Sequence, residues 1–524
     1  MSDSKTTAAA DRWLHGPASD LLLGSALVYL PLFALLLGAG TRLEAWIPMS
    51  LMPLVILAFN TPHIGATLLR VYEREDDRRA YQIFALYLTL LLVGLSLAGL
   101  YVPVIGSVLI TLYVTVIPWH FTGQNYGIAV LFLRRRGVEL DPETKRPLYL
   151  TFILTYAITF VALHGDVLSD AYAPLRVIGT QYRFFALGIP GSIVWFLLAG
   201  LAIGYVHCVL QALSRLRAVA SWGQIAPAVA LMGVQALWYA VPILIYFVMD
   251  PSGIFPFDAA HYAYTFTWIT QIHAVQYLWV SSYFAQRRDP GLSTGRYFGR
   301  ALLAGTAVYG VPALLLAPGV LGSVPFDGGL FIMLAGALNL HHVLLDSAIW
   351  KLRSSRVASV LLRPSESVTA PAERAPSGWR PLVWASGTLG LALMVFGTLE
   401  SHFGSLGAIE RKDLVRLEQS SRRLAWMGRE SPNLHESIAV LRAERGDLGG
   451  ALEALERAVS LQATDTAWVN IGRIRERSGD LPGAIEAYRE AAALAPDSED
   501  VRRELERALE TRAASRVRRE DVAS

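Results

Sequence analysis

Long apolar runs before residue 400 constrain this chain more than any other feature. A helix needs about 20 mostly apolar residues to cross a bilayer. Eleven segments meet that requirement: 20–40, 46–69, 81–103, 105–133, 147–164, 184–210, 226–249, 258–285, 298–320, 328–350 and 379–399. Charged residues make up only 17% of the chain, against about a quarter in soluble domains. We therefore expect an all-α, polytopic transmembrane bundle of about eleven spans.

Basic residues are distributed unevenly between the two sides of this bundle. The segments after the even-numbered spans, 70–80, 134–147, 211–225, 286–300 and 351–380, carry 21 Lys and Arg, and the opposite loops carry 3. Cytoplasmic loops hold the excess of Lys and Arg. The asymmetry predicts a multi-pass protein of a bacterial-type inner membrane, with a cytoplasmic N-terminus and an external C-terminal domain. The first residues lack the apolar core of a cleaved signal peptide.

Composition excludes several classes of function. A formal net charge of +3 is too small to indicate a nucleic-acid partner. The single cysteine, Cys208, excludes an internal disulfide and any zinc site built from several thiolates.

The C-terminal part contains an internal repeat. RGDLGGALEAL and SGDLPGAIEAY are nearly the same phrase, and Gly446 and Ala451 recur 33 residues later as Gly479 and Ala484. This pattern over about 432–498 resembles the tetratricopeptide (TPR) repeat, which implies a small α-solenoid that binds a protein or peptide partner.

These features divide the chain into six parts. We predict a cytoplasmic segment 1–19, a ten-span membrane domain 20–353, a flexible cytoplasmic linker 354–378, an eleventh span 379–399, a TPR-like domain 405–515 and a charged tail 516–524.

Four of the predicted spans carry histidine, and ionisable groups inside a membrane mark functional sites by default. The histidines are His63, His120, His273 and the adjacent pair His341 and His342. At 1.5 Å per residue they lie about 10 to 21 Å from the cytoplasmic ends of their helices. Helices of a bundle can bring such side chains together around a metal. His207 is a further contributor to weigh.

Polar residues accompany each histidine at helical spacing. Asp346 lies one turn after His342 and is expected to act as a ligand or as the acceptor that orients the imidazole. Supporting hydrogen-bonding roles are expected for Asn60, Gln124, Asn125, Gln276 and Asn339. Imidazole with carboxylate suits iron, copper or zinc. The alternative is a purely structural role, in which these histidines only form hydrogen bonds between helices. His15, His164, His261, His402 and His435 are expected to have no such role.

The pattern of histidines near the inner helix ends, with the adjacent pair His341 and His342, resembles that of the membrane non-haem iron oxygenases and desaturases. The phrases PHIGAT at 62–67 and WHF at 119–121 are similar to motifs of bacterial membrane carotenoid-cleaving dioxygenases. The HxxxH and HxxHH boxes of desaturases are absent, and Ile64 is inserted within PHIGAT. The resemblance implies an iron-dependent oxidoreductase acting on a lipid-like substrate.

Two other functions stay open. One is a membrane glycosyltransferase with an external TPR tail, although such enzymes use acidic residues in a large first outer loop and the loop at 40–45 offers only Glu44. The other is a transporter or a scaffold without catalytic activity. Sequence alone assigns no catalytic residue, substrate or organic cofactor.

Overall fold

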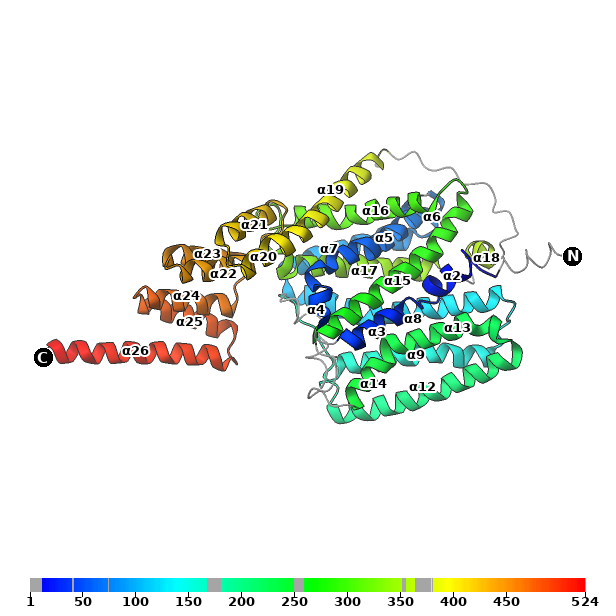
Figure 1. Ribbon diagram of the computed structural model, residues 1–524, viewed down its shortest axis with the longest axis horizontal. Coiled ribbons are helices and arrows are strands. Elements are labelled where there is room, and N and C mark those ends of the chain that lie inside the picture. Colours follow the sequence, from blue (N-terminus) through cyan, green and yellow to red (C-terminus); the bar gives the residue numbers. More distant parts are fainter. Residues whose placement is uncertain are drawn as a thin grey trace. The chain divides into compact units, whose positions relative to one another are not determined.

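The computed structural model describes residues 12–39, 42–73, 75–166, 181–248, 259–350, 355–362, 378 and 380–523. Every regular element among them is a helix, as predicted (Figure 1). The helices are α2 (Pro17–Ser19), η1 (Asp20–Gly24), α3 (Tyr29–Ala39), α4 (Leu43–Trp46), η3 (Met49–Leu51), α5 (Met52–Tyr72), α6 (Glu75–Ala80), η4 (Ile83–Leu88), α7 (Thr89–Tyr101), α8 (Pro103–Arg135), α9 (Pro142–His164), α12 (Gly191–Val219), α13 (Trp222–Gln235), η5 (Ala236–Ala240), α14 (Val241–Val248), α15 (Ala259–Arg288), α16 (Thr294–Leu315), η6 (Phe326–Leu330), α17 (Phe331–Ile349), α18 (Ser355–Leu362), α19 (Arg380–Leu399), η7 (Glu400–Leu406), α20 (Gly407–Glu410), α21 (Leu414–Trp426), α22 (Pro432–Glu444), α23 (Leu448–Leu461), α24 (Asp465–Arg477), α25 (Leu481–Leu494) and α26 (Glu499–Ala523).

Contacts divide the chain into two units. The membrane unit comprises Met1–Val311 and Ile332–Met394, and the repeat unit comprises Pro312–Phe331 and Val395–Ser524. The predicted loop between spans nine and ten therefore groups with the C-terminal helices.

Nine helical segments of the described chain are long and apolar enough to cross a membrane. They are Met49–Tyr72, Ile83–Tyr101, Pro103–Arg135, Pro142–His164, Gly191–Val219, Trp222–Leu244, Thr294–Leu315, Phe326–Ile349 and Arg380–Glu410. The count rises to ten if the pair Pro17–Gly24 and Tyr29–Ala39, bent by 48° within the predicted first span 20–40, is taken as one span. The predicted eighth span falls on α15, which is not among the helices apolar enough to cross a membrane. A total of eleven spans therefore stays a prediction.

Exposed apolar side chains agree with a lipid environment. On α12, Phe196 and Ile203 are 79% and 72% exposed, which a soluble protein avoids in contiguous patches.

Glycine allows α5 and α16 to pack backbone against backbone. A Cβ on Gly65 would lie 1.8 Å from the carbonyl oxygen of Ala301, and one on Gly305 would lie 2.0 Å from that of Thr61. Small residues at membrane helix crossings permit this approach. The crossing fixes the part of α5 that carries His63. In the same way, α19 meets α16 where Gly390 faces Gly310.

Part of the segment 354–378, predicted as a flexible linker, is helical instead. Ser355–Leu362 forms α18, and Val357, Val360 and Leu361 are buried against helix α8 and its neighbours. Three apolar residues on one helix face favour packing over a free chain. Residues 363–377 lie outside the described residues, as do the basic residues of 351–354.

The repeat unit follows the 33-residue periodicity closely. Asp447 and Asp480 cap the N-termini of α23 and α25, and each accepts a hydrogen bond from the backbone three residues on. The preceding Gly446 and Gly479 both have φ of +83°, which favours glycine. Ala451 and Ala484 are fully buried where paired helices touch.

Candidate metal centre

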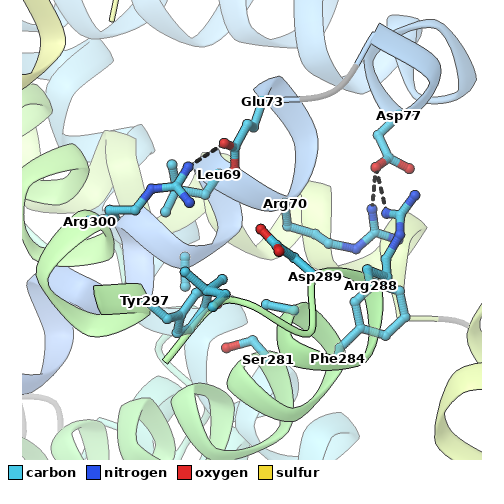
Figure 2. A pocket seen from close by; sticks show the side chains of 13 residues that line it. Leu69, Arg70, Glu73, Asp77, Ser281, Phe284, Arg288, Asp289, Tyr297 and Arg300 are labelled. Atoms are coloured by element: carbon cyan, nitrogen blue, oxygen red, sulfur yellow. Dashed lines mark hydrogen bonds and ion pairs between the residues drawn. The ribbon is translucent and has the colours of Figure 1, made fainter. Parts of the chain in front are cut away.

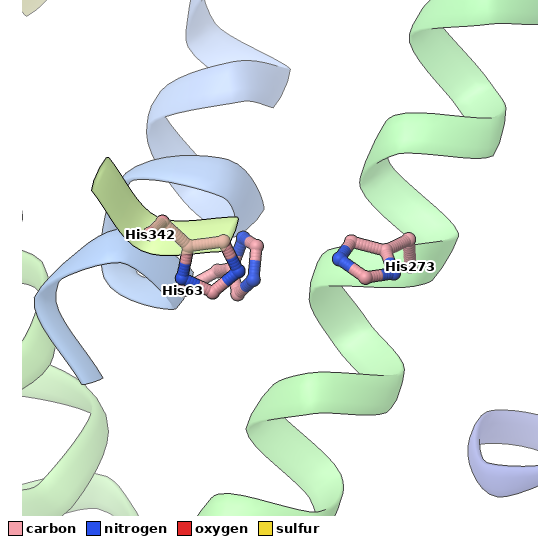
Figure 3. Close-up of side chains that lie close together, drawn as sticks. All are labelled: His63, His273 and His342. Atoms are coloured by element: carbon pink, nitrogen blue, oxygen red, sulfur yellow. The ribbon is translucent and has the colours of Figure 1, made fainter. Parts of the chain in front are cut away.

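Four histidines from four helices converge inside the membrane unit. His63 of α5, His120 of α8, His273 of α15 and His342 of α17 form what we call the imidazole cluster. The ring centroid of His63 lies 4.0 Å from that of His342 and 5.0 Å from that of His273, and His120 lies 4.9 Å from His273. Figure 3 shows the ring of His273 facing those of His63 and His342. In that trio, one nitrogen per ring lies within 4.8 Å of the others.

Six imidazole nitrogens of the cluster are buried without hydrogen-bond partners among the described residues. Within the described chain this holds for both ring nitrogens of His63 and His273 and for Nε2 of His120 and His342. A buried polar atom without a partner is costly and calls for an explanation. Several nitrogen lone pairs directed into one small space form a suitable donor set for a transition-metal ion.

Asp346 of α17 adds a carboxylate to this set. Its Oδ2 lies 3.3 Å from Nε2 of His342 and 3.8 Å from Nε2 of His120. His120, His342 and Asp346 therefore form a second group within metal-binding distance, and it shares His342 with the first.

A chain of hydrogen bonds connects His342 and Asp346 on the side that faces away from the other imidazoles. Thr67 donates to the hydroxyl of Tyr277 at 2.6 Å, and Tyr277 donates to Oδ1 of Asp346 at 3.1 Å. Nδ1 of His342, 2.8 Å from Thr67 Oγ1, is then the donor to Thr67. Trp350 Nε1 also donates to Tyr277 at 3.1 Å. With its proton on Nδ1, His342 presents the lone pair of Nε2 to the cluster.

His341, predicted as a ligand, and His207, considered as a further contributor, both lie apart from the cluster. Nε2 of His341 lies 2.8 Å from Thr89 Oγ1 and 3.3 Å from the hydroxyl of Tyr72. Adjacent residues on a helix point about 100° apart, so His341 and His342 face different neighbours. His207 is exposed on α12.

The predicted supporting residues pack nearby but contact other groups. Gln124 donates to the backbone carbonyl of His273, Gln276 to that of Gly24, and Asn339 to that of Ala335. Asn125 donates to Gln235, and Asn60 is buried on α5. Among the described residues, none of the five bonds to an imidazole nitrogen of the cluster.

The predicted site did not include Thr67, Tyr277 or Trp350. Thr67 and Tyr277 lie four residues after His63 and His273, so each shares a helix face with its histidine. That spacing was the available signal.

Two of the histidines outside the cluster have hydrogen-bond partners elsewhere. Nε2 of His164 lies 3.1 Å from Thr115 Oγ1, and Nε2 of His435 lies 3.0 Å from Glu430. The side chain of His261 lies outside the described residues.

A cavity of about 300 Å³ adjoins the cluster. His120 and Asp346 reach its wall, which is otherwise mostly apolar and includes Trp119, Tyr277 and Trp350. Gly123 and Gly127 also line it, and a Cβ on either would meet no atom within 4 Å. The missing side chains on this face of α8 help to leave the cavity open.

A second buried polar group lies nearer the ends of α5 and α15. We call Arg70, Asp77 and Arg288 the arginine–carboxylate cluster. One guanidinium nitrogen of each arginine lies 2.9 Å from Oδ2 of Asp77 (Figure 2). Burial raises the pKa of Asp77, but Arg70 and Arg288 outweigh it and hold that pKa below its ordinary value. Arg300 and Glu73 form a neighbouring ion pair. Two arginines face one carboxylate here, so this cluster does not favour the binding of a further cation.

Comparison with known proteins identifies only part of the repeat unit. A family model for the tetratricopeptide repeat matches residues 466–498, the second copy of the predicted repeat. No curated protein and no solved structure matches the chain, so the resemblance of the membrane helices to iron oxygenases has no counterpart here. A tetratricopeptide repeat is a protein-interaction module, and the C-terminal helices contain one.

Proposed function

We propose that this chain is a membrane oxidoreductase that uses non-haem iron to act on a lipid-like substrate. The observation that carries the proposal is the convergence of buried imidazole nitrogens without partners in the imidazole cluster. His63, His120, His273 and His342 would hold the metal, with Asp346 as a ligand or as the acceptor that orients the ligands.

The donor set favours a single ion. His342 belongs to both groups of metal-binding side chains, yet with Nδ1 bonded to Thr67 it has one nitrogen to offer. Imidazole with carboxylate suits iron, and also copper or zinc. Iron in such a set supplies oxidation chemistry with dioxygen.

Thr67 and Tyr277 would position the ligands. Their hydrogen bonds to Nδ1 of His342 and Oδ1 of Asp346 fix both side chains from behind. Partners of this kind fix the tautomer and raise the basicity of a metal-bound histidine.

The cavity beside His120 supports an apolar substrate. Its volume of about 300 Å³ is within the usual range for small-molecule sites. Its mostly apolar wall favours a hydrocarbon chain, and Gln124 and Ser347 offer polar contacts to one end of such a molecule.

The glycosyltransferase alternative gains no support from Glu44. Its Oε1 accepts from the backbone of Met49, and its Oε2 accepts from Tyr264. Both oxygens are thus engaged within the protein, which leaves the short outer loop without a free carboxylate.

Comparative mass spectrometry of membrane lipids tests the proposal. Cells that produce the wild-type protein under air should contain an oxidised lipid that is missing when His342→Ala is produced. Gly127→Leu should also abolish this product, because the new side chain occupies the cavity, but it should leave bound metal unchanged.

Gly233→Leu is the matched control. Gly233 lies on α13 away from the cavity, and a Cβ there would likewise meet no atom within 4 Å. Identical lipid profiles for wild type and His342→Ala would contradict the proposed activity.

A further inference from the structure

A groove of about 660 Å³ lies in the repeat unit where the last apolar helix ends. Its wall combines the aromatic residues Phe396, Phe403 and Trp426 with the arginines Arg416, Arg422 and Arg423. The aromatic residues come from α19, η7 and α21, and the arginines all come from α21. None of these residues belongs to the imidazole cluster.

The sequence of α19 sets the level of the groove relative to a bilayer. No charged residue occurs between Arg380 and Glu400, and Arg380–Glu410 is one of the candidate spans. Phe396 therefore belongs to the last turns of the apolar run, and Phe403 lies about one turn beyond it. With α19 as a membrane span, which its length and composition allow, the groove would lie where the hydrocarbon layer meets the headgroups.

Its aromatic side chains are unusually exposed. Trp426 is 90% exposed, Phe396 64% and Phe403 56%. Aromatic residues are enriched at the level where a membrane meets water. Such exposed side chains are available for contact with lipid.

The groove also carries an excess of positive charge. Arg423 pairs with Glu400 at 2.7 Å, which neutralises one of the three arginines. Arg416 donates to the backbone carbonyl of Phe403 at 3.1 Å. In the described part of the chain, neither Arg416 nor Arg422 forms an ion pair with a carboxylate.

We propose that this groove binds an anionic phospholipid. The guanidinium groups of Arg416 and Arg422 contact the headgroup phosphate, for which arginine offers paired donors. An acyl chain lies against Phe396, Phe403 and Trp426. A lipid fits better than a soluble peptide, because the aromatic face continues into the apolar run of α19. The site is independent of the metal-dependent function.

Native mass spectrometry of the full-length protein in detergent tests the site. Phosphatidylglycerol and phosphatidylcholine with the same acyl chains are titrated, and bound lipid is counted. We expect the wild type to prefer phosphatidylglycerol. Each basic residue near an anionic lipid surface strengthens binding about fivefold. Arg416→Gln/Arg422→Gln should therefore lose about 25-fold in affinity for phosphatidylglycerol. The loss for phosphatidylcholine should be smaller, because its choline cation offsets the charge of the same phosphate. Trp426→Ala should weaken both lipids.

Arg489→Gln/Arg512→Gln is the matched control, since it removes two exposed arginines from α25 and α26. It should bind both lipids as the wild type does. Equal affinity of the wild type for the two headgroups would overturn the proposal. An equal loss in the control variant would also overturn it, because the effect would then be one of overall charge.

Discussion

Two clusters of buried polar side chains lie in the membrane unit, and they differ in how their polar groups are paired. In the arginine–carboxylate cluster, Asp77 is fully buried but faces two guanidinium groups, each at 2.9 Å. In the imidazole cluster, buried ring nitrogens face one another without a hydrogen-bond partner among the described residues. The guanidinium nitrogens of Arg70 also lack a partner of hydrogen-bond geometry, but their charge is paired with Asp77. In the first arrangement, the loss of either kind of partner would leave a buried charge uncompensated and destabilise the fold. The second costs free energy in the absence of a ligand, which is typical of a site kept for function.

The largest effect is expected from Asp77→Asn. Removing one partner of a buried ion pair leaves the other charges uncompensated and costs about 3–5 kcal/mol. Denaturation of the protein in mixed micelles measures this. Glu75→Gln is the control on the same helix, because the exposed pair of Glu75 with Arg79 contributes at most about 0.5 kcal/mol. Similar losses for the two variants would remove the distinction between the clusters.

The same carboxylate predicts an acid-dependent loss of stability. The pKa of Asp77 is lower in the folded protein than its ordinary value of 3.8. Its contribution is therefore complete above the unfolded-state pKa and is lost as the pH falls through the lower folded-state pKa. Asp77→Asn should lack this component of the acid transition.

A smaller and more specific effect is expected from Thr67→Val, which keeps the shape of the side chain but removes its hydroxyl. His342 Nδ1 and Tyr277 each lose a partner, and affinity for the metal should fall about 10–100-fold. Competition with a chelator measures it. The control is Thr115→Val, since Thr115 bonds the outlying His164. Unchanged metal affinity in Thr67→Val would mean that the hydrogen-bond chain does not position the ligands.

How far sequence predicts each region depends on the range of the contacts. The repeat was readable because its signals are local: Gly479 forms the turn, Asp480 caps the next helix, and Ala484 meets the paired helix within one 33-residue unit. Solenoid repeats depend mainly on such neighbouring contacts.

The imidazole cluster was only partly predictable. One histidine at a similar depth on each of four helices was enough to predict the convergence of His63, His120, His273 and His342. Helix rotation decides which of His341 and His342 faces inward, and that depends on packing between helices distant in sequence. The partners of the supporting amides, such as Asn125 with Gln235, depend on the same packing.

Metal content of His341→Ala and His342→Ala, compared with the wild type, tests the central claim most directly. The two residues are adjacent on α17 and equal in chemistry, but only His342 belongs to the imidazole cluster. The three proteins are purified from iron-supplemented cells and analysed by inductively coupled plasma mass spectrometry. The wild type and His341→Ala should each hold one transition-metal ion per chain, whereas His342→Ala should hold none and should still fold. A wild-type protein without bound metal, or equal metal content in all three proteins, would contradict the account.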